Sequence, residues 1–417
     1  MNSTKYNIVV IGAGIIGLST AMKLLERHPG LRLAVIEKDA GEGTQQSGHN
    51  SGVIHSGIYY RPGSFKAEFC VAGRSSMTRF CEENRIPIWT CGKLIVATRE
   101  GDEERLTALE QRGIANSVEG LRLVDRDEIA EIEPHVDAEK ALYASETGIV
   151  DYRKVTAAYA DRVRASGGDI FFDTELVGSR VVPGTTVLNT TTGDYETDNV
   201  INCAGLHSDL VAETMGVNTG LRIIPFRGEY YKLRKASERL VKGLIYPVPD
   251  PVFPFLGVHL SQTMKGWVEA GPNAVLATSR EGYRKRDLSF GEFIRMVTFP
   301  GFWKMGIREW KTGIWEINRS LRKGVFLKSL QQMVPELSAT DLNGTGSGVR
   351  AQAVDRAGNL VDDFRIEESD GAIHVLNAPS PGATSSLVIG DHIADLAAKN
   401  FSLAPAVQVA VGERVVV

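Results

Sequence analysis

Residues 48–64 carry the side chains of a chemical site with almost no pattern of a buried core. The segment reads GHNSGVIHSGIYYRPGS and holds His49, His55 and Tyr60 among four glycines, with Lys66 close behind. Packing does not explain such a segment, and loops with these side chains commonly line sites. Because the pKa of histidine lies near neutrality, the segment could supply a proton acceptor.

The elements that must position this segment begin at the N-terminus. Residues 6–17 read YNIVVIGAGIIG, a short buried strand followed by Gly12, Gly14 and Gly17 at the G-x-G-x-x-G spacing and then by an apolar helix. In this motif the glycines allow a tight turn, close approach of the backbone to a pyrophosphate, and close packing of helix on strand. The phosphate binds at the helix N-terminus, here Ile15 and Ile16.

A second strand, over residues 31–36, ends in Glu37, twenty positions after the last glycine. A carboxylate there can accept hydrogen bonds from a ribose hydroxyl, and it repels a 2′-phosphate. The pattern therefore predicts FAD or NAD rather than NADP.

Bulk composition narrows the class of protein. The 417 residues are 43% hydrophobic and 24% charged, with a formal net charge of −4, which is ordinary for a globular enzyme and lacks the basic footprint of a nucleic-acid binder. The four cysteines have no metal-site spacing, so we expect reduced thiols and no metal. With only Met1–Lys5 before the first strand and no long apolar run, we expect a cytoplasmic protein, with peripheral contact to an inner membrane left open.

Nucleotide-binding features recur at the start, middle and end of the chain, with β-rich and helical segments between them. We expect residues 344–358, which are rich in glycine, to form a loop, and a strand over 256–260. The predicted fold is α/β. It has a discontinuous Rossmann-like domain that binds the dinucleotide (1–86, 142–215 and 345–400), an inserted α+β substrate domain with a mixed or antiparallel sheet (87–141 and 216–344) and a C-terminal tail (401–417).

Several motifs together resemble the L-2-hydroxyglutarate dehydrogenase (oxidase) family, within the FAD-dependent D-amino-acid-oxidase-like superfamily. Beside the glycine fingerprint they are HNSGVIHSGIYY at 49–60, CGKLIVAT at 91–98, PFLGVH at 254–259, GVRAQAVD at 348–355 and NAPSPGATSS at 377–386. The resemblance implies FAD and oxidation of a small dicarboxylate 2-hydroxy acid, with quinone or oxygen as the final acceptor. It also implies a set of cofactor contacts beyond the fingerprint: Glu37, Lys38, Ser47, His49, Asn50, Ser51, Val177, Ala204, Gly205, Gly382, Ala383 and Thr384.

The implied chemistry needs a grip on the carboxylates and a base for the hydroxyl proton. Arg350 matches a superfamily arginine that holds the substrate carboxylate bidentately; the alternative is a surface arginine in a glycine loop. His55 and His259 are the candidate bases, and either could instead be structural. Candidates for contacts to the rest of the substrate are Tyr60, Arg61, Lys66, Arg227 and Arg280, although Arg227 could simply pair with Glu229.

Two further features leave alternatives open. His49 has the spacing of a histidine that is joined covalently to the flavin in related N-methylglycine-type dehydrogenases, but we expect noncovalent FAD. Residues 290–330 interleave Trp303, Trp310 and Trp315 with basic side chains, a pattern typical of an interfacial helix or of ordinary domain packing.

Other functions fit part of the pattern. The same fold could oxidise an amino acid, an N-methyl amine or glycerol 3-phosphate, and a non-catalytic flavin-binding protein is a further alternative.

Overall fold

The computed structural model describes residues 5–250 and 257–403. Its Rossmann-like layer is an eight-stranded sheet in the order β10-β11-β12-β1-β2-β9, with β20 paired to β12 and β19 paired to β20. The five central strands run parallel: β1 (Lys5–Ile11), β2 (Leu33–Ile36), β9 (Asp169–Phe171), β12 (Gly193–Asn202) and β20 (Ala372–Asn377). The antiparallel strands are β10 (Leu176–Val182), β11 (Thr185–Thr190) and β19 (Arg365–Ser369).

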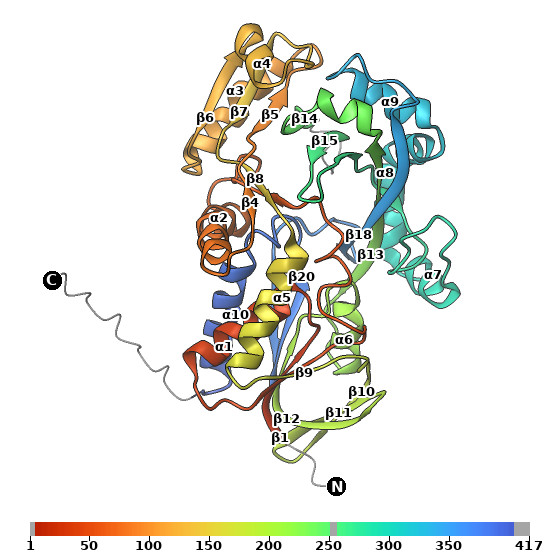
Figure 1. Cartoon of the computed structure of the whole chain (residues 1–417). Coiled ribbons are helices and arrows are strands. Elements are labelled where there is room, and N and C mark those ends of the chain that lie inside the picture. The colour runs from red at the N-terminus through yellow and green to blue at the C-terminus, as the bar shows by residue number, and fades with distance from the viewer. Residues whose placement is uncertain (1–4, 251–256, 404–417) are drawn as a thin grey trace, which may run out of the picture.

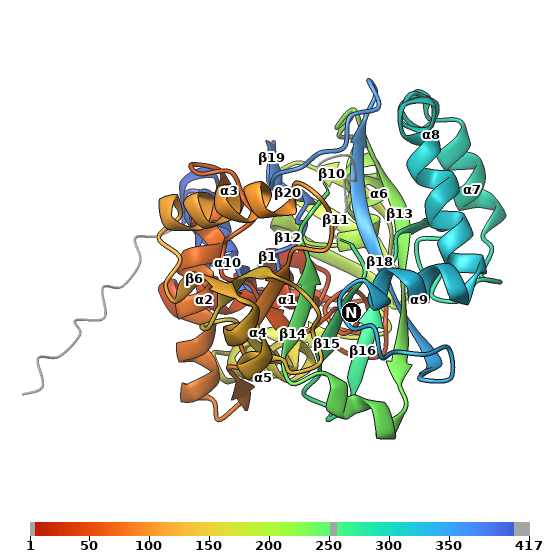
Figure 2. The same cartoon turned by 90° about the horizontal axis from the view of Figure 1, so that it is seen from above.

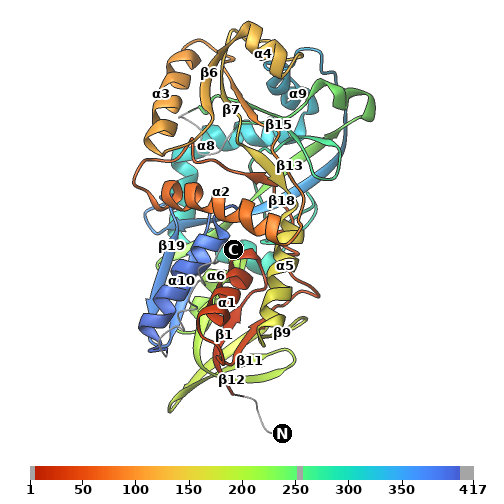
Figure 3. The same ribbon diagram turned by 60° about the vertical axis from the view of Figure 1, so that its left-hand side comes forward.

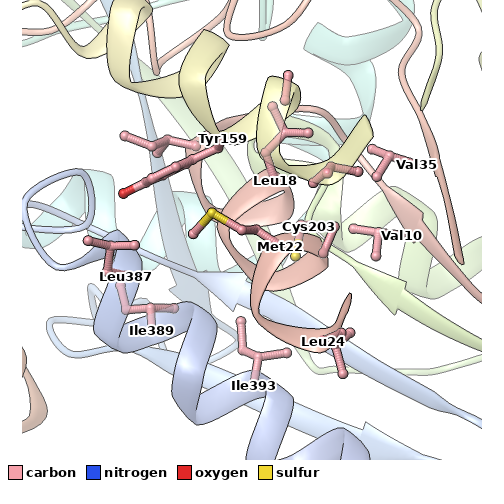
Figure 4. Close-up of a cluster of buried hydrophobic side chains, with 14 of the residues drawn as sticks. Val10, Leu18, Met22, Leu24, Val35, Tyr159, Cys203, Leu387, Ile389 and Ile393 are labelled. Carbon is pink, nitrogen blue, oxygen red and sulfur yellow. The ribbon is translucent and has the colours of Figure 1, made fainter. Parts of the chain in front are cut away.

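Helices cover one face of this sheet (Figure 1). They are α1 (Ile15–Arg27), α2 (Phe65–Glu83), α5 (Tyr152–Ala165) and α10 (Ser386–Asn400). A further short helix, α6 (Ser208–Thr214), packs in a separate cluster and follows the 3-10 turn η1 (Gly205–His207). Figure 4 shows how Leu18 and Met22 of α1 pack against Ile389 and Ile393 of α10, with Tyr159 of α5 beside them. Leu18 is fully buried, so shortening it to alanine would cost about 2–5 kcal/mol.

The second layer is a nine-stranded sheet in the order β17-β13-β16-β15-β14-β5-β7-β6, with β18 also paired to β13. Neighbouring strands of this sheet run antiparallel, except β5 and β14, which run parallel. The strands are β5 (Lys93–Val96), β6 (Leu121–Asp125), β7 (Lys140–Ala144), β13 (Leu221–Leu233), β14 (Leu244–Pro247), β15 (His259–Gln262), β16 (Val268–Gly271), β17 (Val275–Leu276) and β18 (Leu342–Asp355).

Helices also flank the second sheet. They are α3 (Asp102–Ala115), α4 (Arg126–Ile132), α7 (Phe290–Val297), α8 (Pro300–Leu321) and α9 (Lys323–Gln331), with the 3-10 segment η2 (Lys235–Leu240). Between the two layers lies a small sheet of β3 (Val53–Ile54), β8 (Gly148–Val150) and β4 (Ile88–Trp89). Figure 3 shows α2 lying across the molecule at this level.

The expectation of a loop over 344–358 is wrong. Residues 342–355 form β18, which pairs antiparallel with β13 along nearly its whole length. Glycine lowers strand propensity, but here a partner 120 residues earlier in the chain supplies the hydrogen bonds. Gly348 is required for space, because a Cβ there would collide with the carbonyl oxygen of His49.

The predicted domain division remains a proposal. Two of its boundaries fall inside strands, since 141/142 lies within β7 and 344/345 within β18. A division after Ala144 and before Leu342 would keep these strands whole. The predicted strand over 256–260 extends partly beyond the described residues; its described part contributes to β15. Most of the expected tail also lies outside them.

Candidate active site

A cavity of about 840 Å³ is lined by residues of both sheets. The Rossmann-like sheet contributes the residues at and after the carboxyl ends of β1, β2, β12 and β20, and the second sheet contributes β13, β14, β15 and β18. Ligands of open parallel α/β sheets bind at the carboxyl ends of the strands. The cavity is therefore where this fold would hold a dinucleotide.

The turn between β1 and α1 has the geometry of a phosphate site. Gly12 has φ +104°, and a Cβ there would lie 2.6 Å from the carbonyl oxygen of Cys203, so only glycine fits. Gly14 begins α1 without a side-chain cap, and the Ile15 N–H donates to Ser47 Oγ at 2.9 Å. The free N–H groups of this first turn lie beside the cavity, where they would bind a pyrophosphate. Gly17 does not line it; a Cβ there would collide with the Gly12 carbonyl oxygen.

Glu37 lies at the end of β2 and lines the cavity. One carboxylate oxygen accepts the Ala13 N–H at 2.7 Å and the other accepts the Asp39 N–H at 3.0 Å. Burial raises the pKa of Glu37, while these two hydrogen bonds favour its charged form. The carboxylate is thus fixed in place, with lone pairs left for a ribose hydroxyl.

Almost all the expected cofactor contacts meet in this cavity. It is lined by Gly12, Gly14, Ile15, Ile16, Glu37, Lys38, Ser47, His49, Asn50, Ser51, Ala204, Gly205, Gly382, Ala383 and Thr384. Val177 is the exception besides Gly17. Its side chain is 61% exposed on β10, whereas Thr174 and Leu176 line the cavity. The set fits an extended FAD, because backbone and short polar groups surround a long groove that begins at a helix N-terminus.

The two candidate bases lie at the other part of the cavity. His259, on β15, is 5% exposed, and its Nδ1–H donates to the Gly257 carbonyl oxygen at 3.0 Å. His55 follows β3, and its Nε2 lies 3.3 Å from Ser380 Oγ. Burial, with a smaller contribution from the charge of Lys93, lowers the pKa of each histidine to about 3. Both imidazoles are therefore neutral at physiological pH and able to accept a proton.

Arg350 also lines the cavity, from the middle of β18, where it stands opposite Phe226 of β13. Burial lowers the pKa of its guanidinium, and Tyr230 and Glu316 oppose that effect. An arginine that lines the same cavity as two neutral histidines is an arrangement that can hold a carboxylate while a histidine accepts a proton.

The structure does not bring every candidate cation to the cavity. Arg227 is buried and pairs with Glu229 at 3.1 Å, as the alternative interpretation expected. Arg280 is buried and makes a bidentate pair with Asp209, 71 residues away in the chain. Arg61 is exposed and is not among the lining residues. Tyr60 and Lys66 do line the cavity, and Lys66 pairs with Asp362 at 2.8 Å.

Two lining residues at this end of the cavity, and a lysine behind them, were absent from the sequence-based candidates. Tyr59 and Tyr246 line it, and the ammonium of Lys93 lies over both rings, 4.7 Å and 4.3 Å from their centroids. In the sequence Lys93 stands at the start of a strand beside a glycine, where a lysine ordinarily faces solvent. Its burial becomes visible only in the folded chain.

The described part of the chain offers no other centre of this kind. No group of three histidine, cysteine, aspartate or glutamate side chains within it is placed to hold a metal ion. Cys70, Cys81 and Cys203 are buried free thiols, and burial raises the pKa of each to about 12.

Known proteins share both the sequence and the fold. The chain is 47% identical to an L-2-hydroxyglutarate dehydrogenase of Indibacter alkaliphilus, over 95% of this chain and all of that one. It is 44% identical to the Escherichia coli strain K12 protein of that name, over 93% of this chain and 92% of the other. The human mitochondrial protein of that name is 41% identical, over 96% and 90%.

Solved structures agree in fold at lower identity. The L-α-glycerophosphate oxidase of Mycoplasma pneumoniae with FAD bound superimposes with a TM-score of 0.77 at 22% identity, over 96% of each chain. Glycine oxidase of Geobacillus kaustophilus gives 0.72 at 19% identity, over 96% of this chain and 98% of that one. The model of the FAD dependent oxidoreductase family (DAO) matches residues 7–396. The chain is therefore an FAD-dependent oxidoreductase and belongs to this family.

Proposed function

We propose that this protein oxidises L-2-hydroxyglutarate to 2-oxoglutarate with FAD as its cofactor. The observation that carries the proposal is that His55, His259 and Arg350, from three distant segments, line the same cavity as the dinucleotide-binding turn. Relatives with 41–47% identity over nearly the whole chain bear the name of this activity. Other substrates of the same fold belong to proteins that are only about 20% identical.

Different residues would bind the substrate and accept its proton. When bound, FAD supplies the acceptor for the hydride that leaves the substrate Cα. Arg350 holds the carboxylate next to that carbon through paired N–H donors, which fixes the Cα–H direction. A neutral histidine accepts the hydroxyl proton, so that the oxygen can form the new carbonyl bond.

We propose His259 as this base. Its Nδ1–H is committed to the Gly257 carbonyl oxygen, so the lone pair lies on Nε2. Its ring is stacked on Tyr246, which fixes its orientation. Lys93 and Arg350 both lower the pKa of His259 in the free protein, and a bound dicarboxylate would offset their charge and raise it. His55, which is less buried than His259, remains the alternative base.

A substrate panel tests the proposal. The flavoprotein is mixed without oxygen with L-2-hydroxyglutarate, its D enantiomer, glycine, N-methylglycine or glycerol 3-phosphate, and the 450 nm absorbance of the flavin is followed. We expect rapid bleaching with the first compound alone. Bleaching by an amine or by glycerol 3-phosphate instead would contradict the substrate, and no bleaching by any 2-hydroxy acid would favour a flavin-binding protein without this activity.

We also infer that α7 and α8 bind a membrane surface, as an enzyme that passes electrons to a quinone would require. Large apolar side chains along the outer face of α8 recur at helical spacing and are 49–75% exposed: Trp303, Ile307, Trp310, Ile314, Ile317 and Leu321. Lys304, Arg308 and Lys311 lie among them on the exposed side. Figure 2 shows α7 and α8 together on the flank opposite α2.

This contact would be peripheral. Within residues 5–250 and 257–403 the longest apolar stretches of helix fall short of what a bilayer crossing needs. An amphipathic helix with exposed tryptophans and basic side chains instead lies along the headgroup boundary, where aromatic rings and cations both find partners. We propose that quinone or oxygen takes the electrons from the reduced FAD.

A further inference from the structure

Lys93 is a buried cation without a carboxylate partner. It is 1% exposed, at the first position of β5, where it stands opposite Leu244 of β14 and Ala144 of β7. Within the described residues no aspartate or glutamate oxygen lies within 4.0 Å of its ammonium. Buried charges are normally paired, so an unpaired lysine inside a protein indicates a partner that arrives with a ligand.

The surroundings of Lys93 support its charged form and place it next to two residues of the cavity wall. Its ammonium lies over the rings of Tyr59 and Tyr246, which both line the cavity. Aromatic faces attract a cation and replace part of the water that burial removes. Burial still lowers the pKa of Lys93 to about 7, so a nearby anion would raise it and bind more tightly in return.

The charge of Lys93 is felt where the substrate must lie. It lowers the pKa values of both His55 and His259, the two candidate bases. Lys93 lies behind two lining tyrosines and is not itself a lining residue, whereas the cations that do line the cavity are accounted for: Lys38 pairs with Glu281, Lys66 pairs with Asp362, and Arg350 is assigned to the carboxylate beside Cα. Lys93 is thus the remaining positive charge for a second carboxylate.

Tyr59 supplies an independent observation at the same place. Its hydroxyl is buried, and within the described residues it has no hydrogen-bond partner. Leaving such a donor unsatisfied is costly, and a carboxylate oxygen would satisfy it. The hydroxyl and the ammonium over the same ring together form a site for an anion.

We propose that Lys93 determines specificity for a dicarboxylate: its ammonium, held on the rings of Tyr59 and Tyr246, attracts the far carboxylate of the substrate, and the Tyr59 hydroxyl donates to it. This inference rests on the proposed function and extends it. Lys93 recognises the substrate and takes no part in moving the hydroxyl proton, so its loss should change which acid is oxidised rather than how fast a bound acid reacts.

The experiment compares two acids of equal chain length, L-2-hydroxyglutarate and L-2-hydroxypentanoate, which lacks the second carboxylate. Anaerobic flavin reduction gives kcat/KM for each with wild type, Lys93→Met and Tyr59→Phe. We expect Lys93→Met to lower the ratio of the two values by roughly 30- to 100-fold, through a higher KM for the dicarboxylate. Tyr59→Phe should lower it about tenfold. The matched control is Lys140→Met, on neighbouring β7, whose lysine pairs with Glu103 at the surface.

A second readout avoids turnover. Binding of 2-oxoglutarate and of 2-oxopentanoate is followed by the change in flavin absorbance, and Lys93→Met should weaken only the former. An unchanged preference in Lys93→Met, or equal losses for both acids, contradicts the assignment of Lys93. If wild type oxidises neither acid, the proposed function itself fails. Methionine replaces an unpaired buried charge by an apolar side chain of similar length, so the variant should fold and retain flavin.

Discussion

His259 stacks on Tyr246, with the ring centroids 3.8 Å apart and the ring planes inclined by 15°. The same tyrosine carries Lys93 on its ring, so one aromatic side chain positions the candidate base and the unpaired cation together. Orientation of a base by packing reduces the freedom it must lose when substrate binds. The arrangement gives His259 a fixed direction within the cavity.

Replacing His259 tests its role as the base. We expect His259→Ala to slow reduction of the bound flavin by L-2-hydroxyglutarate about 10²- to 10⁴-fold, since the hydroxyl proton would lose its acceptor. Stopped-flow absorbance under anaerobic conditions measures this rate directly. His55→Ala is the comparison; a large loss there with little effect at His259 would exchange the two assignments, and full rates in both variants would show that neither is essential.

The buried histidines make stability depend on pH. The pKa values of His55 and His259 are about 3 in the folded protein and about 6.5 in an unfolded chain. Between these values the unfolded state binds more protons, so stability is present above pH 6.5 and is lost as pH falls toward 3. The midpoint of thermal unfolding should therefore decrease from pH 7 to pH 5. His259→Asn should reduce the proton uptake on unfolding at pH 5 by about one proton. If the slope of the unfolding free energy against pH is the same in wild type and His259→Asn, this would contradict burial of a neutral imidazole.

Gly12→Ala should abolish flavin binding. Its Cβ would meet the Cys203 carbonyl oxygen at 2.6 Å, in a backbone conformation with φ +104°. The ratio of absorbance at 450 nm to that at 280 nm in the purified protein measures the flavin content. Gly306→Ala, on α8 with open space around the new methyl group, is the matched control and should gain about 0.5–1 kcal/mol without losing flavin. Retention of flavin by Gly12→Ala would refute this account of the turn.

Acid precipitation should release the flavin into the supernatant. The His49 Nδ1–H donates to the Ser347 carbonyl oxygen at 3.1 Å, and the ring packs on Tyr283 at 4.5 Å. These contacts hold the ring in place, and we predict that His49 contacts FAD without a covalent bond. Yellow colour that stays with the precipitated protein would show a covalent link and would make His49 the residue to replace.

The outer face of α8 should carry membrane binding. In flotation with vesicles of phosphatidylcholine and phosphatidylglycerol, the variant Ile307→Ser, Trp310→Ser, Ile314→Ser should lose most binding, because each side chain contributes about 1.5 kcal/mol or more on burial. Ile114→Ser, at an exposed apolar position on α3, is the control. Wild type that does not float would contradict the membrane proposal. A dimer in light scattering that the triple variant abolishes would assign the face to a second copy of the chain.

The sequence predicts the residues of a site well where they all lie in one short segment. Gly12 and Glu37 belong to one strand-helix-strand unit whose spacing fixes their relation to a ligand. Arg280 looked like an available cation because Asp209, its partner, lies in another element. The role of Lys93 is hidden in the sequence for the same reason, since the two rings that cover it come from distant segments.

β18 shows the same limit at the level of secondary structure. Its glycines predicted a loop, and only pairing with β13 makes it a strand. That pairing also places Arg350, so the position of the proposed carboxylate-binding residue depends on a contact that spans more than a hundred residues. Side-chain types indicated the site, but distances within it required the fold.

The contact between Gly348 and the carbonyl oxygen of His49 also links two parts of the site. The strand that presents Arg350 lies against the loop of His49, which lines the cavity expected to hold FAD. A displacement at this contact would therefore move a proposed substrate contact and a proposed cofactor contact together.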